Sequence, residues 1–139
     1  FTSYYEHRLR LDPQDANAHF RLGFVKASLG KIDEAIRGFQ RAIELDPRAS
    51  EPHLHLGIVW LGQGRHAQAQ AEFETALRLD PKSYLAHGNL GLLHMNQGDL
   101  PAAETHLRAA LQLNPNDATA QENLRRVLGA KGAARQSKP

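Results

Sequence analysis

Eight histidines are the residues of this sequence best suited to chemistry, and His19, His53 and His87 recur every 34 residues. An imidazole is a common ligand of transition metals, so the regular spacing raises the question of a metal site. One metal needs its ligand atoms about 2 Å away, whereas neighbouring packed helices lie about 8–10 Å apart. Three histidines in consecutive repeats therefore cannot share one ion. Within a helix, neither His53 with His55 nor His87 with His94 has the four-residue spacing of a metal-binding pair, and we predict no metal site and no cofactor.

Some stretches resemble catalytic or cofactor-binding motifs, but none lies in the secondary structure that such a motif requires. Gly62, Gly64 and Ala67 imitate a dinucleotide-binding loop, but such a loop follows a β-strand, and here the stretch lies between two expected helices. The serines lie near expected helix ends, where a serine caps the helix, and no Gly-x-Ser-x-Gly elbow occurs. The absence of cysteine excludes disulfides and thiolate chemistry. The sequence predicts a protein that is not an enzyme.

The length, composition and charge of the chain exclude further classes of protein. A chain of 139 residues with 41% hydrophobic residues fits one domain, and no run approaches the roughly 18 apolar residues that insert into a membrane. The net charge of +2 comes from the last eleven residues, so the rest of the chain lacks the basic stripe of a nucleic-acid-binding protein. We expect a soluble protein; the cytoplasm is favoured and the periplasm stays open, because a cysteine-free chain fits both compartments. The start at Phe1 rather than at a methionine indicates a piece of a longer protein.

A proline-containing junction recurs along the chain. Asp12-Pro13, Asp46-Pro47, Asp80-Pro81 and Asn114-Pro115 are each 34 residues apart. A fixed period of this length is typical of repeat architectures. Because proline cannot continue the helical hydrogen-bond ladder, each junction ends a helix.

The segments between the junctions carry small and large residues in the same places. Taking units of 16–49, 50–83 and 84–117, the shared positions are the pairs Leu22-Gly23, Leu56-Gly57 and Leu90-Gly91; the turn glycines Gly30, Gly64 and Gly98; and, in the second half, Ala35, Ala69 and Ala103, Phe39, Phe73 and Leu107, and Ala42, Ala76 and Ala110. Steps of three and four residues keep one helix face apolar. Glycine accepts the left-handed conformation that ends a helix. Each unit is therefore expected to be a helical hairpin.

This pattern resembles the tetratricopeptide repeat (TPR) family, whose 34-residue unit has a Leu-Gly pair, an alanine, a phenylalanine and a terminal proline in this order. The resemblance implies an all-α, right-handed solenoid of helix-turn-helix hairpins with a C-terminal capping helix. The departures are histidine where the family has its first large aromatic residue, and Lys26 and His94 where it has tyrosine; only Trp60 is aromatic there.

The resemblance extends beyond the three full units. Residues 1–15 are expected to form a partial repeat and residues 118–128 a capping helix, so that 1–128 is a single TPR domain. Arg125 stands where the unit has a glycine, which is consistent with a helix that ends the stack. Residues 129–139 are small, polar and basic, and we expect them to be a disordered tail.

The first helix of each unit has a second apolar face. The fifth, ninth and twelfth positions point away from the Leu-Gly face, yet they are apolar or glycine in all three units: Phe20, Phe24 and Ala27; Leu54, Ile58 and Leu61; Gly88, Leu92 and Met95. In the TPR family the first helices line the concave surface, and these positions are among those that meet ligands. One interpretation is that neighbouring first helices bury these residues against each other. The other is an apolar groove for a partner helix or an extended peptide.

Polar residues edge this expected groove. They are Asn17, Arg21, His55, Asn89, Asn96 and Asn123. The resemblance does not extend to the clamp that some family members use for chaperone tails, because Phe20, Phe24, His55 and Leu85 replace its lysines and asparagines. Asn89 and Asn123 occupy the position of an asparagine ladder found in sugar-transferase members, and an amide can pair with a peptide backbone. His55 and Arg21 interrupt that ladder.

We therefore predict a non-catalytic protein–protein interaction module that binds a peptide or helix of a partner protein. The expected partner-binding residues are Asn17, Phe20, Arg21, Phe24, Leu54, His55, Ile58, Leu85, Asn89, Leu92, Met95, Asn96 and Asn123. No nucleic acid and no membrane insertion are expected. Two alternatives stay open: a substrate-recruiting region of a larger enzyme such as a glycosyl transferase, and an architectural module that associates with itself through its N-terminal end.

Overall fold

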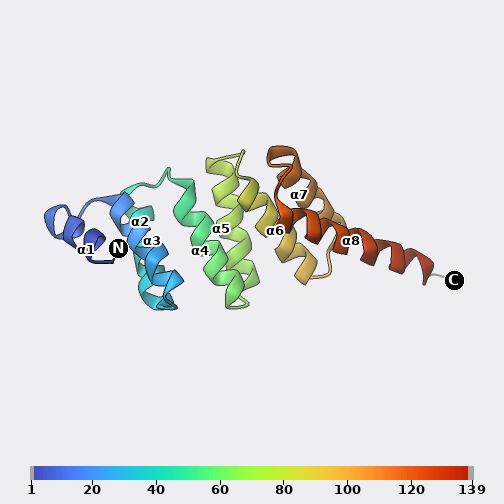
Figure 1. Cartoon of the computed structure of the whole chain (residues 1–139), viewed down its shortest axis with the longest axis horizontal. Helices are drawn as coiled ribbons and strands as arrows, with labels where there is room; N and C mark the ends of the chain where they lie inside the picture. The colour runs from blue at the N-terminus through green and yellow to red at the C-terminus, as the bar shows by residue number, and fades with distance from the viewer. Residues whose placement is uncertain (1, 138–139) are drawn as a thin grey trace. The chain divides into compact units, whose positions relative to one another are not determined.

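A computed structural model describes residues 2–137, which form eight α-helices and no strand (Figure 1). The helices are α1 (Thr2–Leu11), α2 (Ala16–Ser28), α3 (Ile32–Leu45), α4 (Ser50–Gly62), α5 (His66–Leu79), α6 (Tyr84–Asn96), α7 (Leu100–Leu113) and α8 (Ala118–Gln136). They fall into two compact units, α1–α5 and α6–α8, with the boundary between Leu79 and Asp80. None of the helices in the described residues is long and apolar enough to cross a membrane.

Consecutive helices pair as hairpins, as the repeat pattern predicts. In the first unit α2 pairs with α3 and α4 with α5, while in the second unit α6 pairs with α7 and α8 packs against both. The second helix of each hairpin buries the same three positions: Ala35, Phe39 and Ala42 on α3; Ala69, Phe73 and Ala76 on α5; Ala103, Leu107 and Ala110 on α7. These positions are spaced four and three residues apart, so they form one apolar stripe. The prediction of helical hairpins is confirmed.

The glycine of each Leu-Gly pair makes room for a large side chain of the second helix. A Cβ atom at Gly57 would lie 2.6 Å from Phe73 Cε1, and one at Gly91 would lie 2.6 Å from Leu107 Cγ. Real Cβ atoms do not approach other atoms so closely, because repulsion rises steeply below van der Waals contact. The hairpin therefore depends on glycine here for close approach, and not for backbone freedom.

Each proline junction is also held by the residue before the proline. The Oδ1 atom of Asp80 accepts a hydrogen bond of 3.1 Å from the backbone N–H of Lys82, and Asp12, Asp46 and Asn114 accept equivalent bonds. Short Asp and Asn side chains stabilise turns in this way because they pair with the N–H two residues on. The junction thus uses proline to end one helix and Asp or Asn to turn the chain.

Helices α1 and α8 lie outside the three complete hairpins, at the two ends of the chain. Within Thr2–Leu11, α1 has no buried residue, and its Arg8 pairs with Asp15, which caps α2. Helix α8 was expected to end at residue 128, but it continues to Gln136, so residues 129–136 are helical and the expectation of a disordered tail there is corrected. The part of that expectation that falls on residues 138–139 lies outside the described residues. The physical reason is that alanine, lysine and arginine extend a helix readily once it has begun.

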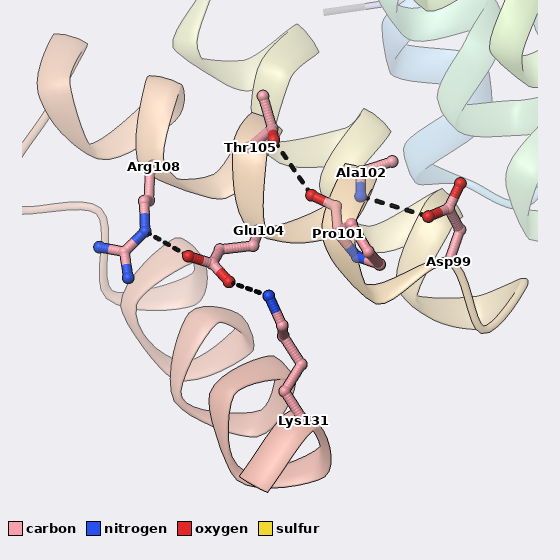
Figure 2. Close-up of polar contacts among 7 residues, drawn as sticks. All are labelled: Asp99, Pro101, Ala102, Glu104, Thr105, Arg108 and Lys131. Atoms are coloured by element: carbon pink, nitrogen blue, oxygen red, sulfur yellow. Dashed lines mark hydrogen bonds and ion pairs between the residues drawn. The ribbon is translucent and has the colours of Figure 1, made fainter. Parts of the chain in front are cut away.

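A tertiary contact also holds the extension of α8. Lys131 Nζ lies 2.7 Å from Glu104 Oε1 on α7, and Arg108 Nε lies 2.8 Å from Glu104 Oε2 (Figure 2). Hydrogen bonds from Lys131 and then from Arg108 lower the pKa of Glu104 from its ordinary value of 4.5 to about 2. The carboxylate therefore stays charged, and keeps both partners, well into the acidic range.

We expect this contact to make the end of α8 acid-sensitive. A carboxyl group whose pKa is lowered by folding stabilises the folded state above its ordinary pKa, and that stabilisation is lost as the pH falls toward the folded-state pKa. Between pH 4.5 and about 2, helical protection of residues 129–136 should fall in the wild type. In Glu104→Gln this added pH dependence should be absent. Amide hydrogen exchange across that range measures it, and equal acid dependence in both proteins would contradict the role given to Glu104.

Candidate functional site

Two large apolar side chains are exposed on the first helices of the first unit. Phe24 on α2 is 47% exposed and Ile58 on α4 is 39% exposed. Phe20 and Leu54, one helical turn earlier, are only 6% and 5% exposed. Phe20 belongs to the core formed with α3 and α4, where its ring lies 5.9 Å from that of Phe39. The hairpins themselves cover most of these two side chains, although Phe20 also lines a hollow between α2, α3 and α4, and contact of Phe20 and Leu54 with a partner stays a prediction.

His55 lies beside these residues and is surrounded by aromatic rings. Its ring centroid is 5.3 Å from that of Phe24 in an edge-on arrangement and 5.4 Å from that of Phe20. Burial lowers the pKa of His55, and Arg21 lowers it further, while Glu51 acts in the opposite direction. The imidazole is therefore neutral near pH 7, with one ring nitrogen that donates a hydrogen bond and one that accepts.

A hollow of about 250 Å³ opens between α2, α3 and α4 in the same unit. Asn17 and Arg21 line it together with the acidic side chains Asp46 and Glu51. Because charges of both signs face the hollow, it does not select for an anion. We use the name aromatic site for Phe24, His55 and Ile58 with Asn17 and Arg21.

The second unit has a smaller hollow, of about 160 Å³, between α6 and α8. Its lining includes Leu85, which is 44% exposed, and Leu92, Asn89 and Asn123. Asn123 is 7% exposed. Asn89 donates from Nδ2 to the carbonyl oxygen of Leu85 at 2.8 Å, which leaves its own Oδ1 as an acceptor. We use the name amide site for Leu85, Asn89, Leu92 and Asn123.

A side-chain amide carries both a hydrogen-bond donor and an acceptor. Asn123 is thus suited to a ligand that supplies both a donor and an acceptor, which a peptide backbone does. The remaining predicted residues of this unit are placed differently. Met95 packs partly buried against the core of the second unit, and Asn96 is exposed at the last position of α6.

Family comparisons agree with this arrangement of hairpins. One tetratricopeptide repeat profile matches residues 16–48 and another matches residues 56–118. The chain belongs to the tetratricopeptide repeat family. No curated protein matches the sequence closely enough to identify a relative.

Several solved TPR structures are similar to the chain. YrrB, described as a TPR protein with an unusual peptide-binding site, is 21% identical with a TM-score of 0.84 over 98% of this chain and 70% of its own. MamA is 21% identical with a TM-score of 0.82, over 94% of this chain and 77% of its own. The first TPR of Spaghetti (RPAP3), bound to the HSP90 peptide SRMEEVD, is 23% identical with a TM-score of 0.81 over 87% of this chain and 96% of its own. At this identity the likeness establishes the fold, which is the all-α TPR fold.

The periodic histidines of this TPR protein each have a contact within their own unit. His19 Nε2 lies 3.0 Å from the carbonyl oxygen of Pro13, and His53 Nδ1 lies 2.6 Å from Glu72 Oε2. His87 Nδ1 lies 3.2 Å from Nδ1 of His106, and burial lowers the pKa of His87. In the described part of the chain, no group of three or more His, Cys, Asp and Glu side chains could hold a metal ion.

Sequence reasoning missed His106 as the neighbour of His87. Gly38, Glu72 and His106 occupy one repeat position, and this position faces the one occupied by His19, His53 and His87. The 34-residue period could have indicated the pair, but the residue type at the position of His106 changes from unit to unit.

Proposed function

We propose that this TPR protein is a non-catalytic interaction module that binds a peptide segment of a partner protein on its first helices. The observation that carries the proposal is the exposure of Phe24 and Ile58 at the aromatic site, next to a neutral His55. Exposed apolar side chains gathered in one place are typical of surfaces that bind proteins.

The amide site supports a ligand with an accessible backbone. An extended peptide offers alternating N–H and carbonyl groups, and the side-chain amides of Asn123 and Asn89, which line the hollow, can pair with both kinds of group. Leu85 and Leu92 beside them are suited to apolar side chains of the same ligand. The proposed ligand is therefore a segment with apolar side chains, held by its backbone as well as by those side chains.

The proposed ligand differs from the peptide bound by the Spaghetti TPR. That HSP90 peptide, SRMEEVD, is acidic at its end. At the aromatic site Arg21 is offset by Asp46 and Glu51, so the site has no excess of positive charge to hold such an end. The proposal thus agrees with the expectation from sequence that the clamp for chaperone tails is missing.

Site-specific crosslinking tests the proposal and identifies the ligand. The photoreactive residue p-benzoylphenylalanine is placed at position 24 or 92, and at position 29 as a control, because Leu29 is 60% exposed but lies at the end of α2. In extract of the native source, position 24 and position 92 should each crosslink to a defined short segment, and a synthetic peptide of each crosslinked segment should bind the purified protein. Equal crosslinking from position 29, or a crosslinked segment whose peptide does not bind, would contradict the proposal.

A further inference from the structure

Gly88 on α6 departs from a pattern that the first helices of the other two hairpins keep. The repeat places Phe20, Leu54 and Gly88 at one position, 34 residues apart. Phe20 and Leu54 are 6% and 5% exposed, so each of those helices packs a large apolar side chain at this position. Helix α6 has no side chain there, and a Cβ atom at Gly88 would meet nothing within 4 Å. Gly88 therefore leaves open a space that the equivalent residues fill.

The space at Gly88 belongs to the amide site. In the first unit the ring of Phe20 packs against the ring of His55, with the centroids 5.4 Å apart. Two repeats further along the chain, the residues equivalent to this pair are Gly88 and Asn123. Both line the hollow of about 160 Å³ between α6 and α8. The hollow thus corresponds to the place that the ring of Phe20 occupies in the first unit.

The lining of this hollow suits an uncharged, apolar side chain. Leu85 and Leu92 supply apolar surface at its edge. The carboxylate of Asp117 also lines the hollow, but it caps α8 by accepting a hydrogen bond from a backbone N–H of that helix. Among the described residues, no lysine, arginine or histidine lines the hollow. It therefore has no positive charge to hold an acidic side chain, and the carboxylate it contains already has a partner.

We propose that Gly88 forms the floor of a specificity pocket for one large apolar side chain, of the size of leucine or phenylalanine, from the peptide that binds the first helices. The side-chain amides of Asn89 and Asn123 hold the peptide backbone beside it. Placing such a side chain in the pocket removes apolar surface from water, which favours binding. The pocket presupposes the proposed peptide binding, and it adds which type of residue the ligand carries and which residue of the chain selects it.

The variant Gly88→Leu fills the pocket from within and tests whether the space exists. Leucine is the residue that α4 carries at the same repeat position, as Leu54, and glycine inside a helix is itself unfavourable. We therefore expect a melting temperature at or above that of the wild type, measured by circular dichroism. A melting temperature that falls by several degrees would show that a side chain has no room at Gly88, and would overturn the proposal.

Short random peptides displayed on phage supply a ligand for the binding test. Selection on the wild type should enrich peptides that share a large apolar residue. Synthetic copies should bind Gly88→Leu at least about tenfold more weakly than the wild type, as measured by fluorescence anisotropy. Gly62→Leu is the matched control, since Gly62 ends α4 and a Cβ atom there also meets nothing within 4 Å. It should bind the peptides as the wild type does.

A change in the peptide shows whether its apolar residue enters this pocket. Replacing that residue by alanine should weaken binding to the wild type about as much as Gly88→Leu does. It should weaken binding to Gly88→Leu little further, because a side chain and the pocket that it fills act as a pair. If the two losses add, the apolar residue binds elsewhere and the pocket is wrong.

The same selection separates failure of the pocket from failure of the proposed function. Peptides that bind Gly88→Leu as tightly as the wild type would overturn the pocket. If Phe24→Asp weakens those peptides, they bind at the aromatic site and the proposed function stands. If selection on the wild type enriches no peptide that binds, both the pocket and the proposed function are wrong.

Discussion

Replacing Gly57 by alanine should lower the free energy of unfolding by about 1–3 kcal/mol, the usual cost of an extra carbon in a filled core. The new Cβ would lie 2.6 Å from Cε1 and 2.8 Å from Cδ1 of Phe73, whose side chain is fully buried. An aromatic ring held in this way cannot bend aside, so α4 and α5 must separate slightly. Urea unfolding followed by circular dichroism measures the loss.

Two further variants distinguish crowding from a general effect of replacing glycine. Gly62→Ala changes the last residue of the same helix, where a Cβ meets nothing within 4 Å, and should not destabilise the protein. In a Phe73→Ala background the added methyl group has room, so Gly57→Ala should no longer lower stability. Equal losses from Gly57→Ala with and without Phe73 would contradict the explanation by close approach.

The fold was predictable because the signals that set it are local and repeated. Asp80-Pro81 ends one helix and turns the chain using only neighbouring atoms, and the same device occurs at each junction. Gly64 has a φ of 75° at the tip of its hairpin, a conformation that L side chains rarely adopt. The end of α8 was not predictable in this way, because Glu104, which pairs with Lys131, lies far from it along the chain.

The candidate sites were only partly predictable. Counting helical positions placed Phe20 and Phe24 on the same face, yet one is 6% and the other 47% exposed. Four residues separate them, so both lie on the same side of α2, and only the position of the neighbouring helices decides which ring is covered. Asn123 was selected as a polar edge residue, but its burial depends on the packing of α8. Periodicity identifies a face of a helix, whereas exposure within that face is a tertiary property.

The peptide identified by crosslinking should bind Phe24→Asp and Ile58→Asp at least about tenfold more weakly than wild type, and the double variant about a hundredfold more weakly if the two effects add. Each substitution places a carboxylate where the proposed ligand sets apolar surface, and a charge buried there without a partner is unfavourable. Fluorescence anisotropy with the labelled peptide measures the dissociation constants.

Stability should change little in the same variants, which separates loss of binding from loss of folding. Phe24 and Ile58 are 47% and 39% exposed, and substitutions at such positions usually alter the free energy of unfolding by about 0.5 kcal/mol. Leu29→Asp is the matched control, because Leu29 is 60% exposed yet lies at the end of α2, outside the aromatic site. It should keep the affinity of the wild type. If Phe24→Asp and Ile58→Asp bind the peptide as tightly as Leu29→Asp does, the ligand does not contact the aromatic site.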